Sequence, residues 1–157
     1  MHGRVVDETY VEDAETPSRV SSSAQQPRLA VLRTLAKANA RAGVRSGSLI
    51  ADREVIASLR RCQAPYPIPV PCAAQAMHAL SEDALAETQR NVAFTCMERD
   101  ALLQSLKRMP TIKRIYPSRT NFILARFADA TAAYQALLDD GIVVRDMRMH
   151  PQLADAL

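Results

Sequence analysis

The side chains that could do chemistry lie in three places, which are the end of one expected strand, the position just after the next strand, and the loop that follows it. Asp7 and Tyr10 stand three residues apart, and Lys37 follows the next strand, with Thr34 three residues before it. Arg45 comes eight residues after Lys37, in a stretch that contains two glycines. Taken singly these residues are ordinary, since a lysine after a strand is usually a surface cation and an aspartate there is usually a turn residue. A function can therefore be inferred only from the set.

Together the five side chains match the needs of a pyridoxal-phosphate site. Such a site requires a lysine amine for a Schiff base and an acid that keeps the pyridine nitrogen protonated. It also requires a hydroxyl near the ring oxygen, and donors that include an arginine for the phosphate. One candidate for each role is present, namely Lys37, Asp7, Tyr10, Thr34 and Arg45.

Composition limits the classes of protein to which the chain can belong. The 157 residues are 48% hydrophobic and 24% charged, as in a globular protein that buries a core without disulfides or metal. The chain has room for one domain, or for a pair of small lobes that share a long helix. Its net charge of +3 comes from intermixed acidic and basic residues, which does not favour nucleic-acid binding. Its apolar runs are too short to span a membrane, and no signal peptide is evident.

The cysteines and histidines do not form a recognisable metal or disulfide pattern. Cys62, Cys72 and Cys96 are odd in number, widely spaced and without a CxxC motif, and the histidines lie far apart. This spacing argues against a zinc site and against a disulfide framework. We therefore expect no metal and a reducing, cytoplasmic location.

Strands and helices are expected to alternate along the chain, which predicts an α/β fold. Asp52 is the expected N-cap of one helix, and Gly141 is the expected C-cap of another. The proline-rich residues 64–71 are predicted to be non-helical and to link two lobes, and residues 13–28 to form a loop with at most a poor helix. The expected strands are 4–10, 29–35, 48–51, 113–118, 121–127 and 142–146, and the expected helices are 53–62, 72–80, 81–109 and 129–141.

The long helix expected at 81–109 carries a mostly apolar stripe. Its members recur at alternating spacings of four and three residues, which predicts one buried face. They are Leu85, Gln89, Val92, Cys96, Arg99, Leu103 and Leu106.

Several motifs resemble those of one enzyme family, the histidinol-phosphate aminotransferases. VVDETY is similar to that family's VVDEAY strand, and LAVLRTLAKANARAGVRSGSLIAD resembles its LRTLSKAF-LAGLR-G segment around the cofactor lysine. APYPIPVP resembles its proline-rich connection, and NFILARF and GIVVRD resemble its small-domain strands. The motifs arrive in the family's order from about Arg4 to Leu157, which is essentially the whole chain.

The resemblance implies part of a fold-type I transaminase of the aspartate aminotransferase superfamily. Residues 1–66 would be part of the cofactor-binding large domain, and 67–157 a long connecting helix with a truncated small C-terminal domain. The implied reaction is transamination in histidine biosynthesis, in which an amino group passes between histidinol phosphate and the pair 2-oxoglutarate and glutamate. The implied assembly is a cytoplasmic homodimer.

Roles for individual residues follow from the same resemblance. Lys37 would hold the cofactor as a Schiff base, Asp7 would pair with the pyridinium nitrogen, and Tyr10 would hydrogen-bond the ring oxygen. Thr34 and Arg45 would hold the cofactor phosphate.

Two further residues fall on the substrate side of the implied site. Arg145, in GIVVRD, resembles an arginine that faces the substrate's phosphate. Tyr66 would line the substrate side or pack at the domain junction. The cofactor-lysine segment departs from the family at Ala36, where the family usually has a serine whose hydroxyl contacts the cofactor phosphate.

Both ends of the chain fall abruptly beside expected ordered segments, so we expect a piece of a longer protein. The family's phosphate-cupping turn, ring-stacking aromatic and ring-oxygen asparagine belong to its first half and have no counterpart in these 157 residues. Impaired activity of the chain by itself is therefore expected. The alternatives are a non-catalytic remnant, another fold-type I transaminase such as one for aromatic amino acids, and an unrelated small α/β domain.

Overall fold

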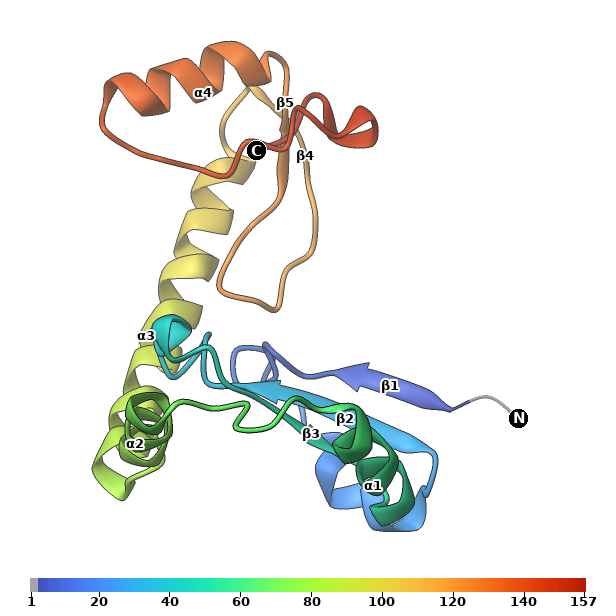
Figure 1. Cartoon of the computed structure of the whole chain (residues 1–157). Coiled ribbons are helices and arrows are strands. Elements are labelled where there is room, and N and C mark those ends of the chain that lie inside the picture. The colour runs from blue at the N-terminus through green and yellow to red at the C-terminus, as the bar shows by residue number, and fades with distance from the viewer. Residues whose placement is uncertain (1–2) are drawn as a thin grey trace. The chain divides into compact units, whose positions relative to one another are not determined.

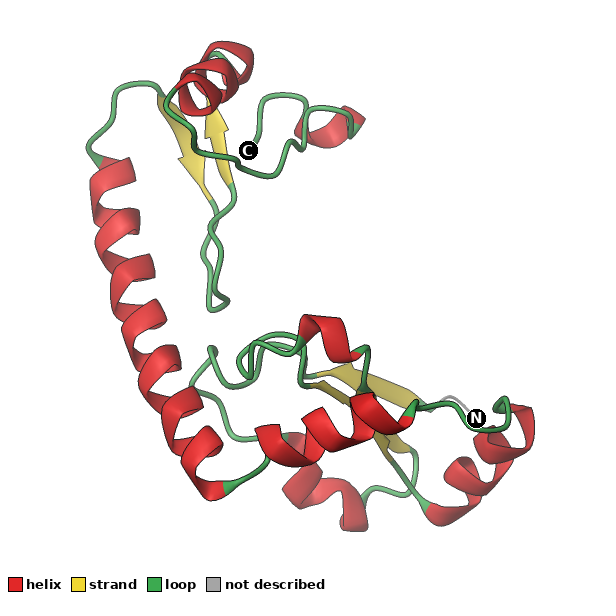
Figure 2. Cartoon of the chain, turned by 60° about the vertical axis from the view of Figure 1, so that its left-hand side comes forward, coloured by secondary structure: helices red, strands yellow, loops and turns green. Residues whose placement is uncertain are grey.

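The computed structural model describes residues 3–157 and has the α/β composition expected from the sequence (Figure 1). It divides within one long helix into two units, Met1–Ala93 and Phe94–Leu157, and each is described by itself. Figure 2 shows the helices, strands and loops of both in a second view. Among residues 3–157, no helix combines the length and the apolar character that crossing a bilayer requires.

A three-stranded sheet forms the centre of the first unit, in the order β1 (Arg4–Asp7), β2 (Leu29–Thr34), β3 (Gly47–Ile50). β1 runs parallel to β2, whereas β3 is antiparallel to β2. The parallel pair needs a long crossover, which residues 8–28 supply through a 3-10 helix, η1 (Arg19–Gln25), packed against β2. All three strands were predicted from the sequence, although the one expected at 4–10 ends at Asp7, and η1 agrees with the expected loop containing at most a poor helix.

β2 is the central strand because one of its faces is apolar and buried. Leu29 and Val31, two residues apart, point to the same face, and Val31 is fully buried. Leu32, on the opposite face, is 37% exposed. This alternation fixes the register of β2, since a shift by one residue would expose Val31.

Two short helices follow the sheet. α1 (Arg53–Cys62) begins where the sequence predicts, and the Asp52 carboxylate accepts a 2.8 Å hydrogen bond from the Glu54 backbone N–H as its cap. α2 (Val70–Ala79) begins inside the segment 64–71, so the prediction that this whole segment is non-helical is wrong at its end. The first turn of a helix tolerates Pro71 because the backbone N–H groups there have no partner within the helix.

The long helix α3 (Glu82–Lys107) confirms the helix expected at 81–109. Only part of its apolar stripe is buried as predicted. Cys96 is buried and Val92, Leu103 and Leu106 are half-buried, so the middle and end of the stripe face other parts of the chain. Leu85 and its neighbour in the stripe, Gln89, are exposed. The stripe prediction is therefore wrong for the first turns of the helix.

The second unit contains a two-stranded antiparallel sheet, β4 (Ile112–Ile115) with β5 (Ala125–Phe127), and the helix α4 (Ala130–Asp139) against β5. The Asp129 carboxylate caps α4 by accepting a 2.9 Å hydrogen bond from the Ala132 N–H. Gly141 ends the helix with a φ of +76°, as predicted for a glycine at this position. β5 is shorter than the strand expected at 121–127.

The strand expected at 142–146 does not form, and this prediction is wrong. The free edge of β5 is taken instead by the last residues of the chain. The Ala125 N–H donates to the Leu157 carbonyl at 3.1 Å, and the Phe127 N–H donates to the Asp155 carbonyl at 2.8 Å. Residues 142–146 belong to no strand, the Ile142 N–H donates to the Leu137 carbonyl at 2.7 Å, and Val143 is 80% exposed.

Candidate active site

The parallel pairing of β1 and β2 brings two groups of predicted site residues to one edge of the sheet. Asp7 pairs with Leu32 at the end of β1, and the Glu8 N–H extends the ladder by donating to the Leu32 carbonyl at 2.9 Å. The carboxyl ends of both strands therefore lie at the same edge of the sheet, where open α/β sheets place their ligands. Asp7 and Tyr10 follow β1 there, and Lys37 follows β2.

The Lys37 amine and the Tyr10 ring come together at this edge. The Lys37 Nζ lies 5.0 Å from the centroid of the ring, within the range of a cation–π contact. Lys37 itself is exposed, so its amine is accessible from solvent. These residues belong to different strand ends, so the contact depends on the strand pairing.

A tight turn holds the backbone of Lys37. The Lys37 carbonyl accepts a 2.8 Å hydrogen bond from the Ala40 N–H, and the Leu35 carbonyl accepts a 2.9 Å bond from the Arg41 N–H. Ala40 has a φ of +53°, in the left-handed region that L-residues other than glycine rarely adopt. The turn that presents Lys37 therefore stores some backbone strain at Ala40.

The Thr34 hydroxyl closes this loop. It donates to the Ser46 carbonyl at 3.2 Å and accepts a 3.1 Å hydrogen bond from the Ala36 N–H. Its single proton is thus used inside the protein, which leaves only acceptor capacity for another group. Thr34 also pairs with Gly47 of β3, so it lies beside the segment that carries Arg45.

Arg45 ends the 3-10 helix η2 (Ala42–Val44) with a φ of +54°. Its side chain donates from one terminal nitrogen to the Ala42 carbonyl at 3.1 Å, and the residue is exposed. A guanidinium carries five N–H donors, so the remaining ones can serve an anion.

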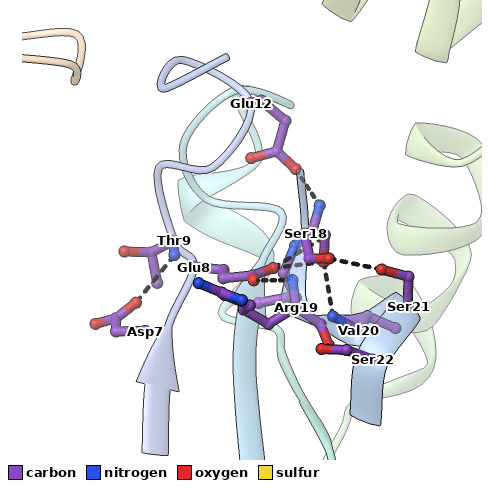
Figure 3. A network of polar contacts seen from close by, with 10 residues as sticks. Asp7, Glu8, Thr9, Glu12, Ser18, Arg19, Val20, Ser21 and Ser22 are labelled. Atoms are coloured by element: carbon purple, nitrogen blue, oxygen red, sulfur yellow. Dashed lines mark hydrogen bonds and ion pairs between the residues drawn. The ribbon is translucent and has the colours of Figure 1, made fainter. Parts of the chain in front are cut away.

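Asp7 is exposed and sits in a local turn. One of its carboxylate oxygens accepts a 2.9 Å hydrogen bond from the Thr9 N–H, as Figure 3 shows. This bond shapes the chain between Asp7 and Tyr10.

A buried polar network beside these residues was missed by the sequence analysis. Glu8 is 5% exposed, and its carboxylate accepts hydrogen bonds from the Ser18 hydroxyl at 2.7 Å and the Arg19 N–H at 2.6 Å (Figure 3). Arg33 of β2 lies 3.5 Å from the same carboxylate and is also paired with Glu12. The usable signal was a charged residue inside the apolar run of β2, since such a residue needs a partner.

The two predicted substrate residues lie in different units. Tyr66, in the first unit, is 95% exposed and has a φ of +54°. Arg145, in the second unit, is exposed in the segment after Gly141, which belongs to no helix or strand. Next to it the Asp146 carboxylate accepts hydrogen bonds from the Arg148 side chain at 2.8 Å and from its backbone N–H at 2.9 Å. These bonds lower the pKa of Asp146 from 3.8 to about 2.

Comparison with known proteins places the chain in one class of enzyme. The family model for aminotransferase class I and II matches residues 4–151, and the chain belongs to this family of fold-type I, pyridoxal-phosphate-dependent enzymes. Within the family, the chain is 55% identical over 153 residues to the histidinol-phosphate aminotransferase of Xanthomonas oryzae pv. oryzae. The match covers 98% of this chain and 42% of that relative, so the chain spans about two fifths of the curated relative's length.

Solved structures share the fold. The histidinol-phosphate aminotransferase of Clostridium acetobutylicum is 26% identical with a TM-score of 0.78, over 91% of this chain and 44% of that one. The enzyme of the same name from Sinorhizobium meliloti, solved in complex with pyridoxal-5'-phosphate, has a TM-score of 0.71 at 21% identity. That match covers 90% of this chain and 39% of that one and shows the fold alone.

Replacing Ala40 by glycine is expected to stabilise the first unit. Glycine adopts a positive φ without the steric cost of a Cβ, and part of this gain is offset by its greater freedom in the unfolded chain. We expect Ala40→Gly to raise the free energy of unfolding by about 0.5–1 kcal/mol in urea melts followed by circular dichroism.

The matched control is Ala42→Gly in the same loop, where φ is not positive. This change should lower the free energy of unfolding by about 0.5–1 kcal/mol. Equal effects of the two substitutions would show that Ala40 is not strained.

The Asp146 titration should depend on Arg148. Because the folded-state pKa is lowered, the pair stabilises the fold above the ordinary pKa of 3.8, and this contribution is lost as pH falls through about 2. In Arg148→Gln, carbon-detected NMR of the Asp146 carboxyl should show its midpoint rising toward 3.8. Arg145→Gln, which removes the adjacent charge, is the control and should leave the midpoint near 2; a midpoint unchanged in Arg148→Gln would refute the pairing.

Proposed function

We propose that these 157 residues carry the cofactor-lysine region and small domain of a histidinol-phosphate aminotransferase. The reaction is transfer of an amino group between histidinol phosphate and 2-oxoglutarate, in histidine biosynthesis. The observation that carries the proposal is the contact between the Lys37 amine and the Tyr10 ring, at the same end of the sheet as Asp7, the last residue of β1. The 55% identity to a relative of that name supports this substrate over the aromatic amino acids.

The residues at the strand edge fit the ring of pyridoxal phosphate. The cofactor supplies an electron sink that makes a bond to the substrate's α-carbon labile. The exposed Lys37 Nζ would hold the cofactor covalently, and its free amine would serve as the base that moves a proton. Asp7 has a carboxylate oxygen outside its turn bond to accept from the ring N–H, and the Tyr10 hydroxyl serves the ring oxygen.

The fit to the cofactor phosphate is weaker. The Thr34 hydroxyl is used by the Ser46 carbonyl, and Ala36 has no side-chain donor. Arg45 is the remaining predicted donor, with most of its guanidinium N–H groups outside the Ala42 bond. Arg45 therefore supplies the main phosphate contact from these residues, with Thr34 in a supporting role after its hydroxyl rotates.

The remaining assignments complete the proposal. Arg145 binds the substrate's phosphate through its planar donor fork, and Tyr66 lines the substrate side. The lobes divide near residue 66, with the cofactor-binding part before it. The enzyme acts as a homodimer in the cytoplasm. The motif resemblance and the exposure of both side chains support the roles of Arg145 and Tyr66, and the other assignments rest on the resemblance and the cysteine pattern.

Cofactor attachment can be tested directly on the chain. Condensation of a lysine amine with the aldehyde of pyridoxal phosphate releases water, and borohydride reduces the resulting C=N bond to a stable secondary amine. The lysines of the chain are Lys37, Lys107 and Lys113, so the last two serve as internal references. Peptide mapping should find the label predominantly on Lys37, and equal labelling of all three would refute the assignment.

The 157-residue chain by itself is expected to be a poor catalyst. The turn, aromatic and asparagine that the family draws from its first half lie outside these residues, and Ala36 removes a further donor. Each lost donor to a charged group costs about 1.5–3 kcal/mol, so turnover should fall at least ~100-fold below the usual 1–10 per second. The assay is conversion of histidinol phosphate and 2-oxoglutarate with excess cofactor.

Ordinary turnover by the 157 residues would show that the absent parts are dispensable. Recovery of activity on adding the first half of a relative as a separate polypeptide would support the proposed function. Labelled Lys37 without such recovery would instead favour a non-catalytic remnant that still binds cofactor.

A further inference from the structure

The Glu8 carboxylate is buried, and its partners Ser18, Arg19 and Arg33 are distant from it along the chain. It is 5% exposed, and charged groups this buried are costly unless they are paired and hydrogen-bonded. One oxygen accepts from the Arg19 N–H at 2.6 Å, and the other accepts from the Ser18 hydroxyl at 2.7 Å. The crossover is thereby tied to the end of β1.

Arg33 ties the same point to β2. Its guanidinium lies 3.5 Å from the Glu8 carboxylate, 3.4 Å from the Ser18 hydroxyl, and is paired with Glu12. Glu8 and Glu12 flank Tyr10 on both sides along the chain. The turn that carries Tyr10 is therefore anchored at both ends to one side chain of β2.

The network lies next to the candidate site without occupying it. Figure 3 shows the Asp7 carboxylate on one side of the end of β1 and the Glu8 side chain on the other. Arg33 likewise directly precedes Thr34 and stands four residues before Lys37. Neighbouring side chains on an extended chain point to opposite faces of a sheet. We therefore infer that Glu8 and Arg33 lie on the opposite face from Asp7 and Thr34.

We propose that Glu8 and Arg33 are positioning residues that hold the Tyr10 turn and the Lys37 turn in register. Through them the Lys37 amine is kept against the Tyr10 ring, at 5.0 Å from its centroid, and ready for the aldehyde. The inference rests on the proposed function, because it assigns the pair a role in presenting the cofactor lysine. Loss of the pair frees the Tyr10 turn while leaving the strand ladder of β1 and β2 in place.

The test compares labelling of Lys37 with that of Lys107 and Lys113 in the same molecule. The readout is the ratio of borohydride-fixed pyridoxal phosphate on Lys37 to the mean on the other two, at a temperature well below the melting midpoint. Glu8→Gln keeps the size of the side chain and removes its charge. We expect the ratio to fall roughly tenfold, the change that corresponds to one lost hydrogen-bonded charge.

Glu15→Gln is the matched control. Glu15 lies in the same crossover and is exposed, and its replacement by glutamine removes the same charge. Its ratio should stay within about twofold of the unaltered chain. Circular dichroism and melting midpoints of both variants establish that they are folded, so that a fall in the ratio reports the position of Lys37 and not unfolding.

Arg33→Lys keeps the inference testable if Glu8→Gln does not fold. Lysine retains the charge but has one nitrogen in place of the two with which Arg33 reaches Glu12 on one side and Glu8 with Ser18 on the other, so the ratio should fall severalfold. If the unaltered chain labels Lys37 selectively and a folded Glu8→Gln or Arg33→Lys keeps that selectivity, the positioning role is refuted and the proposed function stands. If the unaltered chain shows no preference for Lys37, the proposed function fails, and the positioning role fails with it.

Discussion

Parallel pairing of β1 with β2 is the constraint on which the candidate site depends. The ladder from Arg4 to Asp7, extended by the Glu8 N–H, makes two separate segments end at one edge. A parallel connection is usually covered by an α-helix, which contributes its own apolar packing. Here the crossover contains only a 3-10 helix and a loop rich in serine, so polar contacts must do much of the anchoring.

The burial of Glu8 follows from this requirement. A carboxylate taken out of water loses solvation free energy that a single ion pair seldom recovers. Two short hydrogen bonds and the Arg33 guanidinium together satisfy its oxygens, which makes the burial tolerable. Apolar packing of equal volume often stabilises as much or more, but removing one partner of such a network is costly because it leaves a buried charge unpaired.

Local signals in the sequence were sufficient for part of this structure. Asp52 as a helix N-cap predicted α1, and a compact apolar run with β-branched residues predicted β2, because both signals act over a few residues. The motif order placed Lys37 and Tyr10 in one implied cofactor site, but their direct contact was not itself predicted. The partners of Glu8 and the loop bond of the Thr34 hydroxyl were not predictable, because they join segments that are distant along the chain. The wrong prediction of a strand at 142–146 has the same cause. Its residues are typical of a strand, but the edge of β5 is paired with residues 155–157, which are distant along the chain.

That occupation of β5 by residues 155–157 has a consequence for synthesis of the chain. During translation, β4, β5 and α4 emerge before the segment that completes the ladder, so the β5 edge is open until residue 157 has been added. An open edge of unpaired N–H and C=O groups is a template for joining another chain. Until residues 155–157 pair with it, β5 therefore offers an edge that favours pairing with another chain, and their pairing covers that edge.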